Sequence, residues 1–366
     1  MPMLEIRKIK CFELNAFYEE VKNNPILPIS MKRILSYQNN PKRNETLPVL
    51  YLGYIGNNLV TYRSVLQDQF QTQSDEKVSC VWLSGSWTAI NFRKKGYSRI
   101  LLDEISKDYK GYIMNSNYGS HSFSLFSKRT DLVNYRFLEG YRFYYRFSLA
   151  EILPSKSTFF KKIRPFLKGT DQIGNLIFDS RFIFYSKKKI ADIEIAKFDQ
   201  ELANFISNHN KNSLFKRNTE DFQWIFDFPW VIQSAKDGGF DKKYYFTTSA
   251  KRFQKKAFVL RKNNEIKGFL LYSIKNEQMN VHYIFCDSQR ESADFSQFIW
   301  TIIRSEKISS LVMTDKRLID WMQKKGGYIF SKTWNKGYFA GKELLKSFPE
   351  IQNNDIYMGD GDTIFT

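Results

Sequence analysis

The residues best suited to chemistry lie in a short basic loop. It reads Arg93-Lys94-Lys95-Gly96-Tyr97-Ser98, and the apolar residues that follow recur at helical spacing. The free N–H groups and positive dipole end of a helix start attract anions, and a glycine lets a phosphate approach the backbone. The loop therefore predicts a binding site for a phosphate-like anion.

Two elements must position this loop. The stretch Cys80–Thr88 is rich in residues that favour strands, and its centre is the small sequence Ser84-Gly85-Ser86. A glycine inside a strand indicates a bulge or a close approach of a ligand. The stretch Tyr97–Lys107 has the apolar spacing of an amphipathic helix. We expect the order strand, basic loop, helix.

Composition limits the class of protein. The chain has 366 residues, enough for two or three domains, and its 42% hydrophobic content argues against disorder. The net charge of +18 suits acidic partners such as nucleic acid, an anionic membrane or a phosphorylated cofactor. The same charge is also compatible with a lysine-rich surface that only maintains solubility.

Metal, disulfide and membrane signals are absent from the sequence. The odd number of widely spaced cysteines argues against a disulfide framework and a zinc site, and the three histidines share no ligand spacing. No apolar run reaches the roughly 18 residues of a membrane span, and the start has no signal-peptide core. We therefore expect a soluble cytoplasmic protein without a metal.

The order of predicted elements occurs twice along the chain. Each half reads strand, helix, helix, hairpin, long strand, helix, strand, helix and hairpin, which is typical of a duplicated unit. We predict an N-terminal domain at 1–152, a basic connector at 153–190 and a C-terminal domain at 191–366. The connector mixes phenylalanines with basic residues, as nucleic-acid or membrane surfaces do, but we favour a packed helix. The tail at 355–366 is expected to be mostly polar.

This order resembles the GCN5-related N-acetyltransferase (GNAT) superfamily. The family's loop has Arg or Gln, two residues, Gly, one residue, and Gly or Ala, and Arg93, Gly96 and Ser98 stand at these positions. Asn117 and the helix around Ser124–Lys128 stand where the family has its asparagine and LY-x-K helix. The chain looks like a tandem of two such folds, as in FemABX-like aminoacyl transferases. The resemblance implies an α/β class with mixed sheets in two tandem acyl-CoA N-acyltransferase folds.

The resemblance also implies acetyl-CoA or another acyl-CoA as cofactor. Its pyrophosphate would lie on the N–H groups of the basic loop, and its pantetheine arm would pair with the strand. A small-molecule or peptide amine would attack the thioester directly in a ternary complex. The implied cofactor-binding residues are Leu83, Ser84, Gly85, Ser86, Arg93, Lys94, Lys95, Gly96, Tyr97, Ser98 and Asn117.

Proton transfer is not assigned by the resemblance. Many family members have a tyrosine near the leaving thiolate, but this chain has Phe126 there, which cannot donate a proton. Tyr118 or His121 could replace it, although His121 could equally be a surface or capping residue. The predicted strand has no carboxylate, and Glu76 precedes it. The catalytic candidates are therefore Tyr118, His121 and Glu76.

The second half has a different loop. Its counterpart, Cys286–Ala293, lacks glycine and carries Asp287 and Glu291, which would repel a pyrophosphate. We expect a single cofactor site, in the first domain. Two other functions stay open: a catalytically silent binding module, and a FemABX-like transferase fed by aminoacyl-tRNA. The aminoacyl-tRNA-dependent transferase is supported only by the positive charge of the chain, since the sequence has no recognisable RNA-binding motif.

Overall fold

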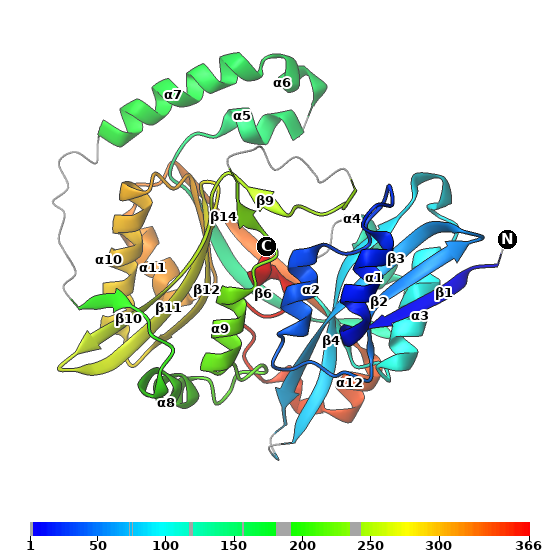
Figure 1. The fold of residues 1–366 in the computed structure, drawn as a ribbon. Helices are drawn as coiled ribbons and strands as arrows, with labels where there is room; N and C mark the ends of the chain where they lie inside the picture. The colour runs from blue at the N-terminus through cyan, green and yellow to red at the C-terminus, as the bar shows by residue number, and fades with distance from the viewer. Residues whose placement is uncertain are drawn as a thin grey trace. The chain divides into compact units, whose positions relative to one another are not determined.

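The computed structural model describes residues 3–72, 74, 76–116, 120–155, 157–180, 192–234 and 243–366 (Figure 1). The chain divides into two compact units. The first unit comprises Met1–Leu138, Phe198–Phe253 and Lys336–Thr366, and the second comprises Glu139–Lys197 and Gln254–Asn335. These bounds differ from the predicted ones at 152 and 191. Phe198–Phe253 and Lys336–Thr366, expected in the second domain, lie in the first unit, and residues 139–152, expected in the first domain, lie in the second unit.

The first unit is built on a mixed sheet with the order β1-β2-β3-β4-β5-β14. Neighbours from β1 to β4 are antiparallel, β5 is parallel to β4, and β14 is antiparallel to β5. β8 and β9 form a separate parallel pair. The strands are β1 (Glu5–Lys10), β2 (Pro48–Ile55), β3 (Asn58–Gln71), β4 (Lys77–Thr88), β5 (Ile113–Asn115), β8 (Ile232–Gln233), β9 (Ser249–Ala250) and β14 (Phe330–Gly341).

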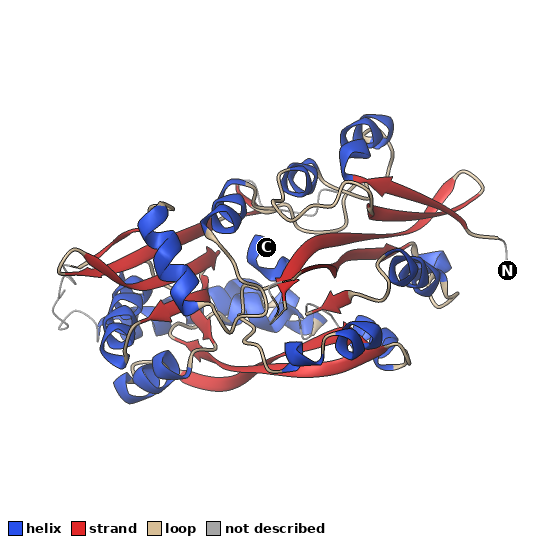
Figure 2. Ribbon diagram, turned by 90° about the horizontal axis from the view of Figure 1, so that it is seen from below, coloured by secondary structure: helices blue, strands red, loops and turns tan. Residues whose placement is uncertain are grey.

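Helices lie on both sides of these strands, as Figure 2 shows. On one side, α3 buries Leu101 and Ile105 against Val65 and Leu83 of the sheet. The alternation of side chains along β4 points Ser84 to the other side, where α2 lies. The helices are α1 (Leu14–Val21), α2 (Met31–Gln38), α3 (Tyr97–Asp108), α4 (Ser120–Ser127), α8 (Gln200–His209), α9 (Thr219–Asp227) and α12 (Lys342–Ser347).

Aromatic packing explains why α9 and the tail belong to the first unit. The indole N–H of Trp224 donates to the carbonyl of Ser36 on α2 at 2.8 Å. Phe365 packs between Trp224 and Trp230, with ring centroids 4.8 and 4.9 Å away. The free energy gained by burying such large rings against α2 exceeds the entropic cost of bringing together segments that are distant along the chain. The tail expected to be mostly polar is largely buried, including Asp360 and the terminal aromatic residue.

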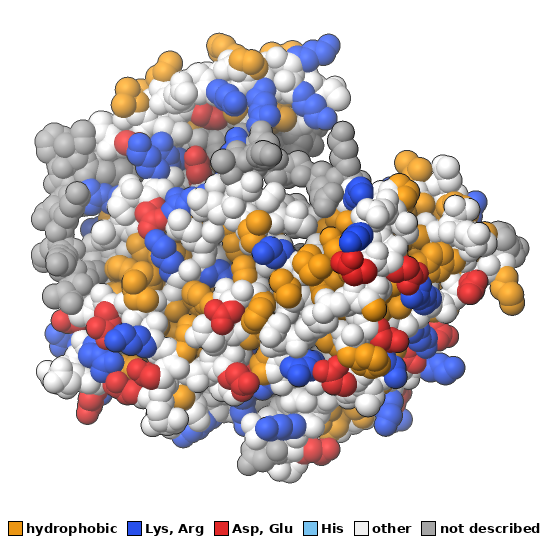
Figure 3. All heavy atoms as spheres, viewed as in Figure 1, with side chains coloured by type: hydrophobic (Ala, Val, Ile, Leu, Met, Phe, Trp, Pro, Cys, Tyr) orange, Lys and Arg blue, Asp and Glu red, His pale blue; other side chains and the backbone are white. Residues whose placement is uncertain are grey.

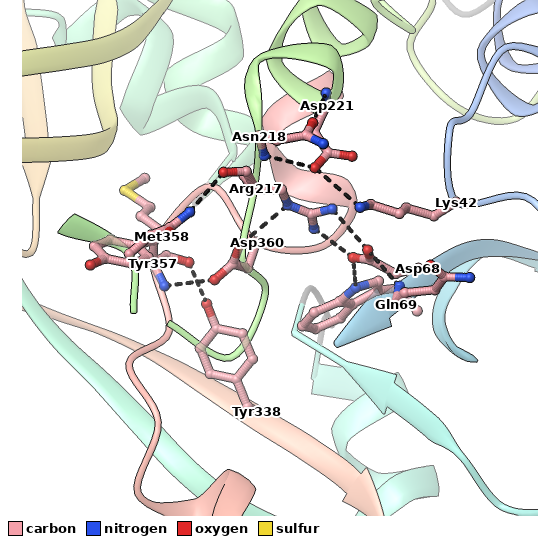
Figure 4. A network of polar contacts seen from close by, with 12 residues as sticks. Lys42, Asp68, Gln69, Arg217, Asn218, Asp221, Tyr338, Tyr357, Met358 and Asp360 are labelled. Atoms are coloured by element: carbon pink, nitrogen blue, oxygen red, sulfur yellow. Dashed lines mark hydrogen bonds and ion pairs between the residues drawn. The ribbon is translucent and has the colours of Figure 1, made fainter. Parts of the chain in front are cut away.

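A buried ion network also fixes the tail (Figure 4). The Arg217 guanidinium donates two hydrogen bonds to Asp68, at 2.8 and 2.5 Å, and lies 3.8 Å from Asp360. The indole of Trp82 donates to the same Asp68 carboxylate at 2.9 Å. Nearby, Lys42 lies 3.4 Å from Asp221. Because a buried charge without a partner is costly, this arrangement holds the tail against β3 and β4.

The strands of the second unit have the order β6-β13-β12-β11-β10-β7 and are of mixed direction. Its core packs one stripe of α10, including Phe295, Ile299 and Ile303, against β11 and β12. The order of elements predicts a closing hairpin at 328–339, but residues 330–339 instead form part of the single strand β14. The strands are β6 (Leu132–Tyr144), β7 (Ile193–Ile195), β10 (Phe253–Lys262), β11 (Glu265–Lys275), β12 (Gln278–Cys286) and β13 (Ser310–Met313); the helices are α5 (Leu149–Ile152), α6 (Thr158–Lys162), α7 (Arg164–Ser180), α10 (Gln289–Ser305) and α11 (Lys316–Lys325).

Three further observations bear on the sequence analysis. All three cysteines are buried and free. Among the described residues, no group of three or more His, Cys, Asp or Glu side chains could hold a metal ion. No helix in the described ranges is long and apolar enough to cross a membrane.

Candidate active site

The predicted bulge in β4 is confirmed at Gly85. Arg63 of β3 pairs with Ser86 and Ser64 pairs with Ser84, so Gly85 is the extra residue between them. Its φ of +38° is in the region that favours glycine. A Cβ atom there would lie 2.6 Å from the Ser64 hydroxyl oxygen. The position therefore requires glycine both for its conformation and for its space.

Strands β4 and β5 pair over a very short distance. The pairs are Val81 with Ile113 and Trp82 with Met114, after which β5 ends at Asn115 while β4 continues. Beyond Trp82, the described residues provide no strand partner for this edge of β4. Backbone N–H and C=O groups at such an edge can pair with an extended ligand.

The start of α3 lies just beyond the end of β4. Gly96 is the N-cap residue, with φ of +80°, and no side chain caps the helix. Within the described part of the chain, the N–H groups from Lys94 to Ser98 have no backbone acceptor. Arg93, Lys94 and Lys95 are exposed beside them. This is a helix N-terminus whose donors and positive charge remain available to an anion.

A buried arginine that the sequence analysis missed lies beside this helix start. Arg63 is only 3% exposed, and its guanidinium donates to the Ser98 hydroxyl at 3.2 Å. Its Nε has no hydrogen-bond acceptor among the described residues. Burial, and then the nearby Arg129, lower the pKa of Arg63 to about 10. In the described part of the chain no carboxylate pairs with this buried cation, which points to an anionic ligand; its sequence signal was a charge within an apolar strand.

A carboxylate also reaches the bulge, from the far end of the chain. The Ser84 hydroxyl donates to Asp362 at 2.7 Å, and both side chains are buried. The same hydroxyl accepts a hydrogen bond from Arg33 at 3.0 Å. The Arg33 guanidinium in turn stacks 3.8 Å from the ring centroid of Trp230. Because Asp362 lies 278 residues from Ser84, no local pattern could have indicated it.

Of the catalytic residues predicted from the sequence, the structure describes Glu76 and the backbone of His121. Glu76 is exposed at the opposite end of β4, nine residues before Gly85 and so about 30 Å away along an extended strand. Asn117 and Tyr118 lie outside the described residues. His121 lies in the first turn of α4. Phe126 is buried, with its ring 5.7 Å from that of Phe339.

In the second unit, the equivalent helix N-terminus is that of α10, and its own side chains cap it. Ser288 accepts a hydrogen bond from the N–H of Arg290 at 3.1 Å and donates its hydroxyl to Glu291. The carboxylate of Glu291 also accepts from Lys262 at 3.1 Å. The start of α10 is therefore a capped and negatively charged helix end, unlike the open and positively charged start of α3.

Comparison with known proteins gives a fold but no sequence family. No family model matches the chain, and no curated protein matches it in sequence. A conserved protein of unknown function from Enterococcus faecalis, described as a probable N-acyltransferase, gives a TM-score of 0.54 at 10% identity, covering 94% of this chain and 74% of its own. Two structures of Saccharomyces cerevisiae N-myristoyltransferase with bound myristoyl-CoA give TM-scores of 0.50 at 10% identity, covering 93% of this chain and 80% and 83% of theirs.

This similarity confirms the predicted fold class. The chain has the mixed α/β fold of acyl-CoA N-acyltransferases. At 10% identity the similarity shows the fold alone, and evidence for the reaction must come from the residues of the site.

Proposed function

We propose that the chain transfers an acyl group from an acyl-CoA to an amine, and that it is a tandem member of the GNAT superfamily with its cofactor site in the first unit. The observation that carries this proposal is the combination of the Gly85 bulge, the edge of β4 that has no strand partner beyond Trp82 among the described residues, and the open start of α3. An extended ligand with a phosphate end fits such a combination, because one end needs strand pairing and the other needs N–H donors.

The residues present suit the parts of an acyl-CoA. Backbone groups of Leu83–Ser86 would pair with the pantetheine arm. The N–H groups of Lys94–Ser98 would bind the pyrophosphate, with Arg93 and the buried Arg63 adding charge. Asn117 remains a predicted contact. The bound acyl-CoA would supply an activated thioester carbonyl, and a backbone N–H at the bulge would stabilise the charge that develops on its oxygen.

Acyl transfer to an amine requires two proton movements. The nitrogen that bonds to the acyl carbon loses one proton, and the sulfur released when the C–S bond breaks gains one. We assign the first proton to Asp362, reached directly or through the Ser84 hydroxyl, because this carboxylate lies beside the bulge. For the second proton, Tyr118 and His121 remain our candidates, since Phe126 has no proton to give.

The reaction can be tested by following thiol release. Purified protein is incubated with acetyl-CoA or a longer acyl-CoA and a panel of amines that includes amino acids, amino sugars and a peptide with a free N-terminus. We expect amine-dependent thiol release that Asp362→Asn reduces by about 10²-fold or more. Binding of acyl-CoA without thiol release for any amine would favour the silent binding module instead.

A further inference from the structure

The connector helix α7 is attached to the second unit by polar contacts. The Asp171 carboxylate accepts from the N–H groups of Leu149 and Ala150, each at 2.9 Å. Asn175 exchanges two hydrogen bonds with the backbone of Phe147, at 2.7 and 2.9 Å. Further along, Arg146 pairs with Asp179. These contacts fix which face of α7 points toward the rest of its unit.

The opposite face of α7 is apolar and exposed. Phe166, Ile173, Leu176 and Ile177 are 70%, 65%, 74% and 64% exposed, and their spacing places them on one side of the helix. Phe159 of α6 is also 60% exposed. Helices of globular proteins normally turn this stripe inward. The connector was expected to be a packed helix, and α7 contacts the rest of its unit largely through its polar side.

The charges around this face have one sign. The basic side chains of α6 and α7 are Lys161, Lys162, Arg164 and Lys168, all exposed. The acidic residues of the two helices, Asp171 and Asp179, are both engaged in the inward contacts. Figure 3 shows hydrophobic and basic side chains together at the top of the view, over α6 and α7. An apolar face with basic residues and no outward carboxylate matches the surface of an anionic bilayer.

We propose that the apolar face of α6 and α7, formed by Phe159, Phe166, Ile173, Leu176 and Ile177, docks on an anionic lipid bilayer. The apolar side chains enter the boundary between headgroups and acyl chains, and the basic residues bind the lipid phosphates. The stripe from Phe166 to Ile177 is about 16 Å long, which is sufficient for a helix lying in the membrane plane. The net charge of +18 on the whole chain favours the same surface. This inference does not depend on the proposed acyl transfer.

Vesicle sedimentation of the full chain tests the proposal. The vesicles contain phosphatidylcholine alone or phosphatidylcholine with phosphatidylglycerol, at physiological salt. We expect binding to the anionic vesicles, and a loss of at least about tenfold in the Ile173→Gln, Leu176→Gln, Ile177→Gln triple variant. A Lys161→Glu, Lys162→Glu variant should lose binding in the same assay.

Controls separate docking from changes in folding. The triple variant alters exposed side chains, so its Tm should equal that of the wild type. Ile195→Gln, at a 75% exposed position on β7, should bind as the wild type does. Absence of binding to anionic vesicles, or equal binding by the triple variant, would overturn the proposal. Concentration-dependent dimerisation that the triple variant abolishes, without vesicle binding, would assign the face to a second copy of the chain and also overturn it.

Discussion

Arg63 on β3 donates a hydrogen bond to the Ser98 hydroxyl, in the first turn of α3, across 3.2 Å. Ser98 is the small residue that ends the basic loop. A hydroxyl that accepts from an arginine keeps its own hydrogen for another acceptor. The pair therefore directs one extra donor and one buried charge toward the place where we expect a pyrophosphate.

Arg63→Met should weaken acyl-CoA binding by about 10- to 100-fold, because a charge-assisted contact is lost. The Tm of the free protein should be unchanged or higher, since the variant removes a buried unpaired charge. Titration calorimetry and thermal unfolding measure the two effects. Arg7→Met is the control, because Arg7 is exposed and paired with Glu20. Unchanged acyl-CoA affinity in Arg63→Met would remove Arg63 from the site.

Asp362→Asn should lower kcat by about 10²- to 10⁴-fold, the usual contribution of a general base, while the Kd for acyl-CoA stays the same. Steady-state thiol release and calorimetry measure these quantities. Ser84→Ala keeps the carboxylate but removes its hydrogen-bond donor, so we expect a smaller decrease in kcat. Asp320→Asn, at an exposed position of α11, controls for charge. Wild-type kcat in a folded Asp362→Asn protein would rule out this base.

Gly85→Ala should lower the free energy of unfolding by about 2–3 kcal/mol, because it adds a side chain at positive φ and overlaps the Ser64 hydroxyl. Gly56→Ala is a matched control: its φ is +55°, but nothing lies within 4 Å of the added Cβ. We expect a cost of about 1 kcal/mol there. Denaturant unfolding compares the two. Equal costs would mean that the bulge is not tightly packed.

Glu291→Gln should reduce stability in a pH-dependent way. Burial acts to raise the pKa of Glu291, but hydrogen bonds from Ser288 and Lys262 outweigh it and lower the pKa to about 2. The stabilisation is therefore fully present above pH 4.5 and is lost as the pH falls toward 2. The variant should be about 1 kcal/mol less stable at neutral pH and should approach the wild type in acid. A constant difference across this range would contradict the assignment.

Local patterns in the sequence predicted much of the fold. Helical spacing indicated α3, and a glycine inside a strand indicated the bulge, because these features depend on residues close together in the chain. Membership of the two units was not predictable in this way. It depends on contacts such as Phe365 with Trp230, which join distant segments.

In the candidate site, too, the features formed by neighbouring residues were predictable and those formed by distant residues were not. The basic loop could be predicted from the sequence, because its glycine and its charged residues are adjacent in the chain. Arg63 and Asp362 could not, because their importance comes from burial and from the neighbours that folding provides. The connector was expected to be a packed helix, whereas the contacts of Asp171 and Asn175 leave the apolar stripe of α7 exposed.

Calorimetric titration of acetyl-CoA and a longer acyl-CoA into the wild type and Gly96→Val shows whether the start of α3 holds an acyl-CoA. Gly96 has φ of +80°, which a β-branched residue rarely adopts, so the variant should distort the start of α3. We predict one binding site per wild-type chain and a loss of at least about tenfold in Gly96→Val. No binding of either acyl-CoA to the wild type, or equal affinity in Gly96→Val, would contradict the assignment.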